Sequence, residues 1–346
     1  MSELLKAIRL LGPSHMLKLG RGYRMGWEEM IQGYVATKTV HSLLSVGVLD
    51  ELREKGSFNP EEYAKARNLD IDVLKPLCEA LYSMGLFDKE GDRYKQAPKL
   101  DSMMDVLRGW IEVSFGYAEV FDSLDKMMTR EKVYARDFYR KSDYVATGSG
   151  EMENWLFFPV CNEVILEGGY KRVMDLGCGD GTFLRKLCQL NSEVQCFGCD
   201  IAPAAIEEGK RRVRAAGLED RIMLHTMDIQ DVQDMPEPFK TVQASTIFFI
   251  LHEILYFGED KLISFLQGYR KAFPKIPLIA FEAIRPTADE MRQRPGIAVY
   301  YYLYHDLTQQ KPVSRERWKE LFKIAGFSSV TERYLSFART AVFTLV

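Results

Sequence analysis

The 346-residue sequence lacks a long apolar run and carries little excess charge of either sign. No apolar run approaches the roughly 18 residues needed to span a bilayer, so we expect no membrane partner. The first 19 residues lack the apolar core and cleavage pattern of a secretory signal, which favours a cytoplasmic protein. The net charge is only −3 at pH 7, so composition gives no electrostatic case for nucleic acid as a partner.

Cysteine is scarce and scattered. Six cysteines in a chain of this length do not suggest a disulfide framework. Cys196 and Cys199 form a C-x-x-C pattern, but no second pair follows it. They fall on an expected strand, where residues three apart point to opposite faces. We therefore interpret both as packing residues.

The most informative feature present is a glycine-rich segment at residues 173–182, VMDLGCGDGT. Asp175 and three alternating glycines, Gly177, Gly179 and Gly181, separate a short apolar run from a helical pattern over residues 182–190. Because glycine lacks a Cβ, it can adopt positive φ and lets a ligand approach the main chain closely. The N–H groups at the start of the helix favour a polar or anionic group. The segment predicts a site for a nucleotide-like cofactor.

The spacing of this segment narrows the choice of cofactor. It reads D-x-G-x-G-x-G, whereas a dinucleotide fingerprint would read G-x-G-x-x-G and a P-loop would need Gly-Lys-Ser/Thr. The segment resembles motif I of the class I S-adenosylmethionine-dependent methyltransferases. That resemblance implies that the loop accommodates the amino-acid part of S-adenosylmethionine.

Two further acids end later expected strands, where open α/β sheets bind their ligands. Asp200 ends a strand over residues 194–200, and Asp228 ends one over residues 222–229. A lone Asp after a strand is usually a helix cap or a turn residue, but three in order favour a site. The resemblance implies that Asp200 binds the ribose hydroxyls and that Asp228 meets the adenine amino group. The expected cofactor site also includes Ile201, Met227 and Ile229.

From residue 172 onward the expected strands and helices alternate, which is typical of a doubly wound parallel sheet. Further strands are expected over residues 242–251, 277–284, 329–336 and 340–345, and helices over 203–216, 252–273 and 315–325. The total of seven strands matches the Rossmann-like class I methyltransferase fold, an α/β fold whose last strand runs antiparallel. We expect this domain to occupy residues 171–346.

The segment 26–98 predicts helices over residues 34–52, 60–67 and 71–84 and a hairpin over 86–94, which is a winged-helix pattern. It holds 9 Lys and Arg against 13 Asp and Glu, a balance that DNA phosphates would repel. This argues against the non-enzymatic alternative, a winged-helix regulator. A winged-helix domain ahead of a methyltransferase fold resembles the dimeric small-molecule O-methyltransferases. The resemblance implies a dimerisation domain over residues 1–100, a helical linker and substrate-pocket lid over 101–170, and a homodimer.

The candidate catalytic groups follow the fourth expected strand. His252 and Glu253 stand where the O-methyltransferase family has His-Asp, with the histidine as general base on a phenol or similar hydroxyl. In plant members two glutamates orient that histidine, and Glu282 matches the first of them. The second should precede the helix containing Trp318, where the sequence reads Lys311-Pro312-Val313 and has no acid.

A second histidine, His305, indicates another chemistry. His252, His305 and the carboxylate of Glu253 could form a facial metal site for a divalent or ferric ion. Such an ion could chelate an α-keto acid and stabilise its enolate as a Lewis acid. This arrangement resembles the α-keto acid C-methyltransferases of the same superfamily. The plainer interpretation is that His305 is a pocket or surface histidine without a metal.

Three enzymatic functions follow for a small-molecule acceptor. The leading prediction is metal-assisted C-methylation of an α-keto acid in specialised metabolism. The alternative is O-methylation of a phenol or enol with His252 as general base. A third keeps S-adenosylmethionine but changes the reaction, for example to a cyclisation. The acceptor itself does not follow from the sequence.

Overall fold

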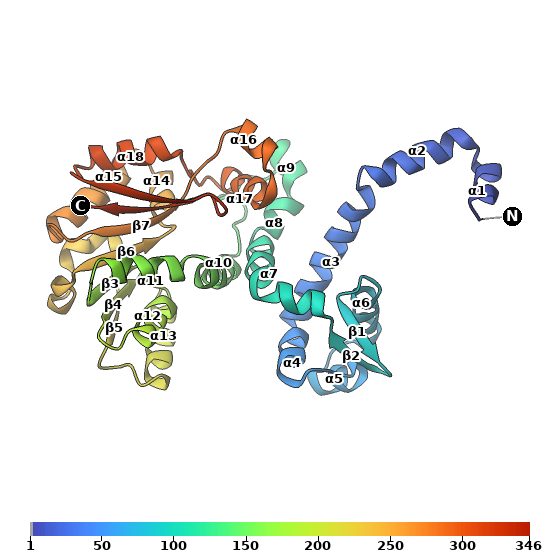
Figure 1. The fold of residues 1–346 in the computed structure, drawn as a ribbon, viewed down its shortest axis with the longest axis horizontal. Helices are drawn as coiled ribbons and strands as arrows, with labels where there is room; N and C mark the ends of the chain where they lie inside the picture. Colours follow the sequence, from blue (N-terminus) through green and yellow to red (C-terminus); the bar gives the residue numbers. More distant parts are fainter. Residues whose placement is uncertain (1–2) are drawn as a thin grey trace. The chain divides into compact units, whose positions relative to one another are not determined.

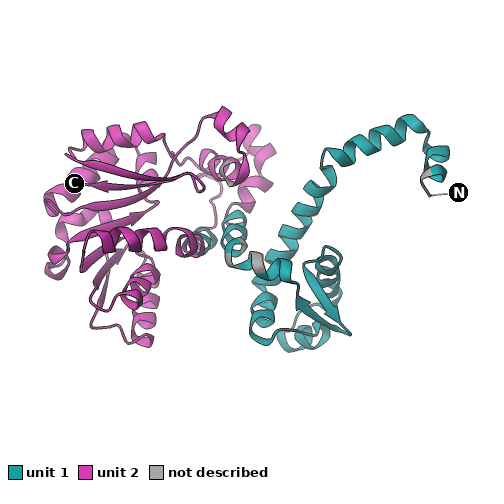
Figure 2. Cartoon of the chain, viewed as in Figure 1, with its two compact units in different colours: residues 1–115, 144–149 teal, residues 116–143, 150–346 magenta. Residues whose placement is uncertain are grey.

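The structure is a computed structural model that describes residues 3–346, except for the side chains of residues 3, 4, 102, 103, 105, 107, 297 and 298. The chain divides into two compact units (Figure 2). Unit 1 comprises the residues up to 115 together with 144–149, and unit 2 comprises residues 116–143 and 150–346.

Unit 1 consists of helices and one short hairpin (Figure 1). Its elements are α1 (Glu3–Leu11), α2 (Pro13–Arg24), α3 (Trp27–Ser45), α4 (Val48–Lys55), α5 (Pro60–Arg67), α6 (Ile71–Ser83), β1 (Phe87–Glu90), β2 (Arg93–Gln96) and most of α7 (Pro98–Gly116). The hairpin predicted after the third helix is confirmed, since β1 and β2 pair antiparallel. Asn59 caps α5, because its side chain accepts bonds from the N–H groups of Glu61 and Glu62. The single helix expected over residues 34–52 is wrong, because Gly47 takes φ 80° and separates α3 from α4.

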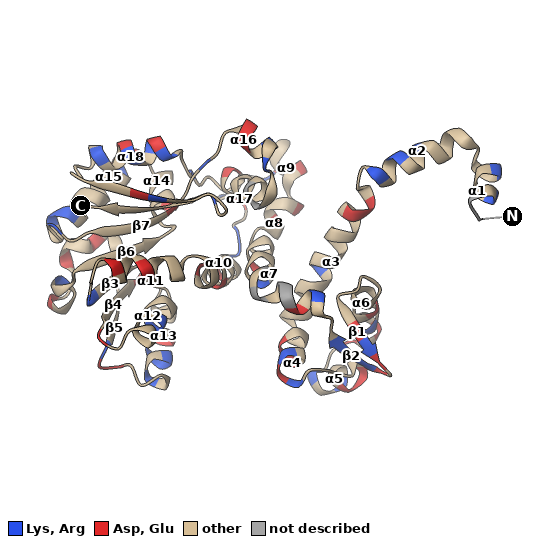
Figure 3. Cartoon of the chain, in the orientation of Figure 1, with Lys and Arg blue, Asp and Glu red and all other residues tan. Residues whose placement is uncertain are grey.

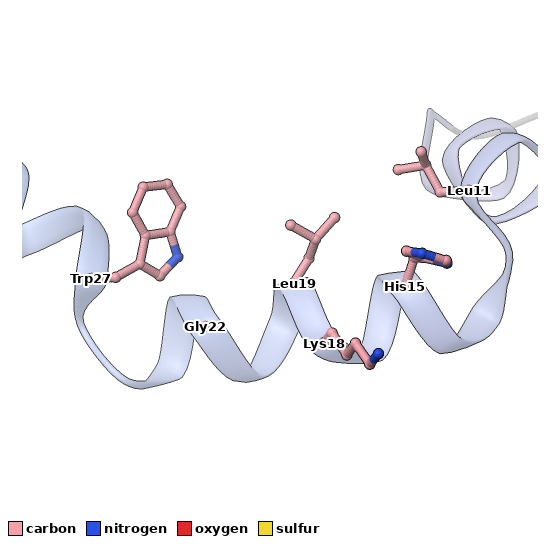
Figure 4. Close-up of a pocket in the computed structure, with 6 residues that line it drawn as sticks. All are labelled: Leu11, His15, Lys18, Leu19, Gly22 and Trp27. Atoms are coloured by element: carbon pink, nitrogen blue, oxygen red, sulfur yellow. The ribbon is translucent and has the colours of Figure 1, made fainter.

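The first helices of unit 1 expose many large apolar side chains. We call residues 5–35, from α1 to the middle of α3, the N-terminal arm. Leu10, Met25 and Met30 are at least three-quarters exposed. A hollow of about 320 Å³ opens on the arm (Figure 4), and it is lined by Leu11, His15, Lys18, Leu19, Gly22 and Trp27. Such a contiguous apolar surface is typical of an interaction site.

Unit 2 is built on a seven-stranded sheet of order β5-β4-β3-β6-β7-β9-β8. Its strands are β3 (Arg172–Leu176), β4 (Gln195–Asp200), β5 (Ile222–Thr226), β6 (Ala244–Phe248), β7 (Leu278–Ala283), β8 (Val330–Leu335) and β9 (Thr340–Leu345). The first five pair in parallel, whereas β9 runs antiparallel to both β7 and β8. The predicted seven-stranded α/β fold with an antiparallel last strand is confirmed.

Successive residues of each strand pack on opposite faces of this sheet, as the strand period of two requires. Val173 and Cys196 join one apolar cluster, whereas Met174 and Phe197 join the other. One face is covered by α11 (Phe158–Glu167), α12 (Thr182–Leu190) and α13 (Pro203–Ala215). The other is covered by α14 (Leu251–Tyr256), α15 (Glu259–Ala272) and α18 (Arg315–Ile324). The remaining helical elements are α8 (Ala118–Asp122), α9 (Leu124–Met128), α10 (Ser142–Leu156), α16 (Ala288–Gln293), α17 (Gly296–Leu307), and the 3₁₀ helices η1 (Ile229–Asp234) and η2 (Glu237–Thr241).

Two strand ends differ from the prediction. The fourth strand stops at Phe248, because Phe249 takes φ 53° and turns the chain out of the sheet. The single helix expected over residues 252–273 is divided into two, because Gly258 at φ 128° separates α14 from α15. The third strand stops at Thr226, so Asp228 lies beyond its end. His252 consequently lies in the first turn of α14.

The structure also bears on the expectations about membrane spans, cysteines and charge. Among the described residues, no helix is both long and apolar enough to cross a bilayer. All six cysteines are buried free thiols, which confirms that Cys196 and Cys199 are packing residues. Basic and acidic side chains intersperse along α13 and α18 (Figure 3), where several form ion pairs within one or two turns.

Candidate active site

The three expected cofactor acids meet at one edge of the sheet. Asp175 belongs to β3, Asp200 ends β4, and Asp228 follows β5. These three strands are parallel neighbours, so their carboxyl ends share an edge. We call this region the cofactor edge, comprising residues 175–181, 200–201 and 227–229. The structure therefore brings together the segments that the sequence predicted for the cofactor.

The glycine-rich loop takes the backbone form that its residues predicted. Gly177, Gly179 and Gly181 all have positive φ, between 52° and 79°. The N–H groups of Gly177 and Cys178 both donate to the Cys199 carbonyl, which fixes the loop to β4. A Cβ on Gly177 would lie 2.1 Å from Cδ1 of Ile250, so a side chain at this position would force that terminal methyl group to move.

The Asp200 carboxylate connects the loop to the start of α13. Its Oδ2 accepts a 2.9 Å bond from the Gly179 N–H, and its Oδ1 accepts one of 2.9 Å from the Ala202 N–H. These bonds hold the carboxylate over the glycine loop, at the position where the sequence predicts a ribose. The neighbouring Ile201 is 66% exposed, so its side chain is free to cover a ligand.

Asp175 is buried beneath the loop. Its carboxylate accepts a 2.6 Å bond from the Thr246 hydroxyl of β6, and the residue is 3% exposed. Burial raises the pKa of Asp175 to about 7, with Thr246 opposing the shift and the Asp200 charge adding to it. Such a carboxyl changes its charge near neutral pH, where a cationic ligand would favour the ionised form.

The third acid has a structural role. Asp228 caps η1 by accepting a 2.9 Å bond from the Gln230 N–H. Met227 precedes it and donates its N–H to the Asp200 carbonyl, and Ile229 is 9% exposed. The plain helix-cap interpretation of Asp228 is thus fulfilled, and its role toward adenine stays a prediction.

The expected catalytic residues lie beyond β6 and β7. His252 is 3% exposed, and its Nδ1 lies 2.9 Å from Oε2 of the fully buried Glu282 on β7. The His252 N–H also donates to the other Glu282 oxygen, at 3.3 Å. Burial opposes protonation of this imidazole, but the Glu282 carboxylate outweighs burial and raises the pKa of His252. The predicted orienting role of Glu282 agrees with this geometry.

His305 comes from α17 and faces His252. The two ring centroids are 5.1 Å apart, and His305 is 6% exposed. Its Nδ1 lies 2.6 Å from the Tyr301 carbonyl. Burial, followed by the neighbouring His252, holds the pKa of His305 well below its usual range. Both imidazoles therefore bond through Nδ1, which leaves each Nε2 for another partner.

Glu253 is directed to other groups. Its Oε1 accepts a 2.7 Å bond from Arg140 Nη2 and a 3.0 Å bond from Gln310 Nε2. Within the described part of the chain, no three His, Cys, Asp or Glu side chains form a metal cluster. The structure thus pairs the two expected histidines but does not bring the Glu253 carboxylate to them as a third ligand.

Several residues of this site were not predicted individually, although Tyr117 and Arg140 fall within the expected pocket-lid segment, residues 101–170. Arg140 precedes α10, Tyr117 precedes α8, and Gln310 lies in the segment after α17. Arg140 Nη1 donates to the Tyr117 hydroxyl at 2.8 Å, and the Tyr117 ring stacks on Tyr304 at 4.6 Å. Gln310 directly precedes residues 311–313, where the resemblance implies a second orienting glutamate. We call the group the acceptor cluster: Tyr117, Arg140, His252, Glu253, Glu282, His305 and Gln310.

Comparison with known proteins gives a family match and several more distant relatives. A family described as "Methyltransferase domain" matches residues 173–271. The 2-ketoarginine methyltransferase of Streptomyces arginensis is 26% identical over 316 residues, which cover 88% of each chain. The indolepyruvate C-methyltransferase of Streptomyces griseus is 26% identical over 160 residues, covering 45% of this chain and 46% of the relative.

Solved structures share the fold at low sequence identity. The human N-acetylserotonin methyltransferase in complex with S-adenosylmethionine superposes with a TM-score of 0.62 at 16% identity. The superposition covers 94% of this chain and 97% of that one.

Proposed function

We propose that this chain, which is a class I S-adenosylmethionine-dependent methyltransferase, methylates the carbon next to the carbonyl of an α-keto acid. The methyltransferase assignment follows from the matched domain over residues 173–271 and from the relative that aligns over most of both chains. Two relatives bear names for methylation of 2-ketoarginine and indolepyruvate, both α-keto acids. Their names support the acceptor class proposed here.

The observation that carries the proposal is the pairing of His252 with His305. Each imidazole has its Nδ1 engaged, by Glu282 and by the Tyr301 carbonyl. Histidines that bind metals usually donate the other ring N–H in this way, which fixes the ring and its tautomer. The second imidazole has no role in a single-base mechanism, but two neighbouring imidazoles, with ring centroids 5.1 Å apart, suit a metal ion.

The donor set fits a divalent or ferric ion through two nitrogens, His252 Nε2 and His305 Nε2. Glu253 would join only after leaving Arg140 and Gln310, so its part as a ligand depends on a rotation of its side chain. When bound, such an ion would polarise the keto and carboxylate oxygens and favour the enolate. The chain's own residues orient the acceptor, so that its carbon faces the methyl group in line with the departing sulfur.

Metal content and product analysis test this proposal. The protein should be purified without a histidine tag, analysed for bound metals, and incubated with S-adenosylmethionine and a panel of α-keto acids and phenols. We expect a C-methylated keto acid, S-adenosylhomocysteine as co-product, and loss of activity in chelator. Full activity in chelator would overturn the metal, and methylation of phenols alone would overturn the acceptor class. Methylthioadenosine as co-product would instead indicate the non-methylating chemistry.

O-methylation of a phenol or enol is the second candidate, and the His252–Glu282 pair favours it. A buried carboxylate at 2.9 Å orients the imidazole and raises its pKa, as expected of a general base. The two candidates differ in their need for His305. His305→Ala should abolish C-methylation of a keto acid and leave O-methylation of a phenol largely intact.

The homodimer is a further part of the proposal, and the N-terminal arm supports it. The arm holds exposed apolar side chains and a hollow of about 320 Å³. A second copy of the chain would remove this surface from water. Light scattering at micromolar concentration should show a dimer, and replacing the exposed Leu10 and Met30 with Glu should weaken it. A monomeric wild type would contradict this assignment.

A further inference from the structure

We infer that Arg140 binds the carboxylate of the acceptor and thereby selects α-keto acids over uncharged phenols. The inference rests on the proposed function and deepens it, because it names the residue that recognises the acid. Three features of the acceptor cluster support it: a mostly buried cation, the bond of that cation to the helical turn that carries His252, and an unpaired amide oxygen.

The guanidinium of Arg140 is mostly buried, with its side chain 19% exposed. Two bonds hold it, to the Tyr117 hydroxyl at 2.8 Å and to Glu253 at 2.7 Å. Tyr117 is itself 1% exposed and stacked on Tyr304, so one side of the guanidinium is fixed. A planar guanidinium carries five N–H donors in a fork that matches a carboxylate.

Arg140 bonds to Glu253, the residue that directly follows His252, so its guanidinium is tied to the helical turn that carries this imidazole. We therefore expect an acceptor bound at His252 to lie near this guanidinium. Glu253, the counter-charge of Arg140, has a side chain that is 44% exposed. Because that side chain borders solvent, it can turn aside when another carboxylate arrives.

Gln310 independently indicates a polar ligand at this place. The residue is 8% exposed, and its Nε2 donates to Glu253, yet its buried Oε1 has no hydrogen-bond partner among the described residues. An unpaired buried acceptor is unfavourable, so a ligand that supplies a donor gains from it. The enol form of an α-keto acid carries both a carboxylate for Arg140 and a hydroxyl for Gln310. A simple phenol offers the hydroxyl alone.

The test compares acid and amide forms of the same acceptor. Steady-state kinetics of the full-length wild type and of Arg140→Gln are measured with 2-ketoarginine and indolepyruvate and with the primary amide of each. We expect Arg140→Gln to raise KM for the acid about 10- to 100-fold, as for loss of a charge-assisted bond, and to leave KM for the amide within about twofold. Arg140→Lys should fall between the two, because it keeps the charge and loses the fork.

Two controls separate recognition from loss of fold. The affinity of Arg140→Gln for S-adenosylmethionine, measured by calorimetry, should equal that of the wild type. Arg136→Gln is the matched variant, since Arg136 belongs to the same segment and pairs with Asp137 at an exposed site. It should leave KM for the acids unchanged.

The outcomes distinguish this inference from the proposed function. A wild type that methylates keto acids, with an Arg140→Gln variant whose KM is unaltered, overturns the inference and leaves the proposed function standing. A rise in KM that is equal for acid and amide also overturns it, because the loss is then not one of charge. A wild type that methylates only phenols overturns both.

Discussion

The cofactor edge and the acceptor cluster are built in different ways. The cofactor edge draws on consecutive residues and main-chain groups: three glycines at positive φ, two N–H bonds to Cys199, and acids in or just after three adjacent strands. The acceptor cluster draws side chains from α14, α17, β7 and the segments around α8 and α10. A backbone site leaves a local sequence pattern, whereas a site made of distant side chains leaves almost none. The following experiments test how far the two regions act separately.

The largest expected effect is on turnover. His252→Ala removes the imidazole that Glu282 orients, and it should lower kcat about 10²- to 10⁴-fold, as for loss of a general acid or base. Affinity for S-adenosylmethionine should stay within about twofold, because the cofactor edge does not use this side chain. Stopped assays and calorimetry measure the two quantities. His225→Ala, on the outer strand β5, is the matched histidine control. A large loss of cofactor affinity in His252→Ala would show that the regions are coupled.

Ile250 lies two residues before His252 and packs against Gly177 of the cofactor edge, and this contact predicts a loss of stability. In Gly177→Ala, a Cβ meets Ile250 Cδ1 at 2.1 Å and the residue keeps φ 79°. Left-handed strain of about 1–2 kcal/mol and overpacking of about 1–3 kcal/mol should both lower the free energy of unfolding. Gly179→Ala has φ 52° but no atom within 4 Å, so only the strain should appear. Urea denaturation compares the free energies of unfolding of the two variants. A second substitution, Ile250→Ala, should restore part of the stability that Gly177→Ala loses. Equal losses would argue against the contact.

Asp200→Ala should weaken cofactor binding by about 10- to 100-fold, the usual range for a lost charge-assisted bond. Isothermal titration with S-adenosylmethionine measures it. Asp200→Asn keeps an acceptor for the Gly179 N–H and should lose less. Turnover at saturating cofactor should change little. Unaltered affinity in Asp200→Ala would remove this residue from the cofactor site.

The smallest expected effect is a pH dependence of cofactor binding. Burial raises the pKa of Asp175 to about 7 in the free chain, and a cationic cofactor favours the ionised carboxylate. Binding then releases a proton, so affinity should rise several-fold from pH 6 to pH 8 and level off above the pKa of the free chain. Asp175→Asn should give a flat profile. A wild-type profile that is flat over this range would place Asp175 away from the cofactor's charge.

The sequence predicted the cofactor edge well because its determinants are local. Asp175, Gly177, Gly179 and Gly181 stand in one loop, and the alternation of strands and helices predicted which strand ends would meet. The ends of strands and helices were predicted less accurately. Phe249 at φ 53° and Gly47 at φ 80° both broke elements that periodicity alone had continued, because apolar patterning does not reveal where the backbone turns.

The acceptor cluster was predicted only in part. His252, Glu282 and His305 were found because histidine is rare and because a resemblance directed attention to them. Arg140 and Gln310 lie 113 and 57 residues from Glu253, to which both bond, so no short motif could join them. Their contacts depend on how α8 to α10 and the end of α17 pack, and packing between distant segments has no periodic signature.

The backbone at Phe249 has a consequence for protein engineering. This residue holds a left-handed conformation that costs a non-glycine residue of order 1–3 kcal/mol, and it does so with its N–H bonded to Phe281 and its ring 4.9 Å from Phe157. The turn at Phe249 leads directly into α14 and sets the direction in which the chain leaves the sheet. It therefore fixes the position of His252 in the first turn of that helix. Selection for thermal stability should therefore favour substitutions of Phe249 that remove this backbone strain. Variants that relax this turn should be more stable to heat, but the His252 imidazole should then no longer be held in its present orientation.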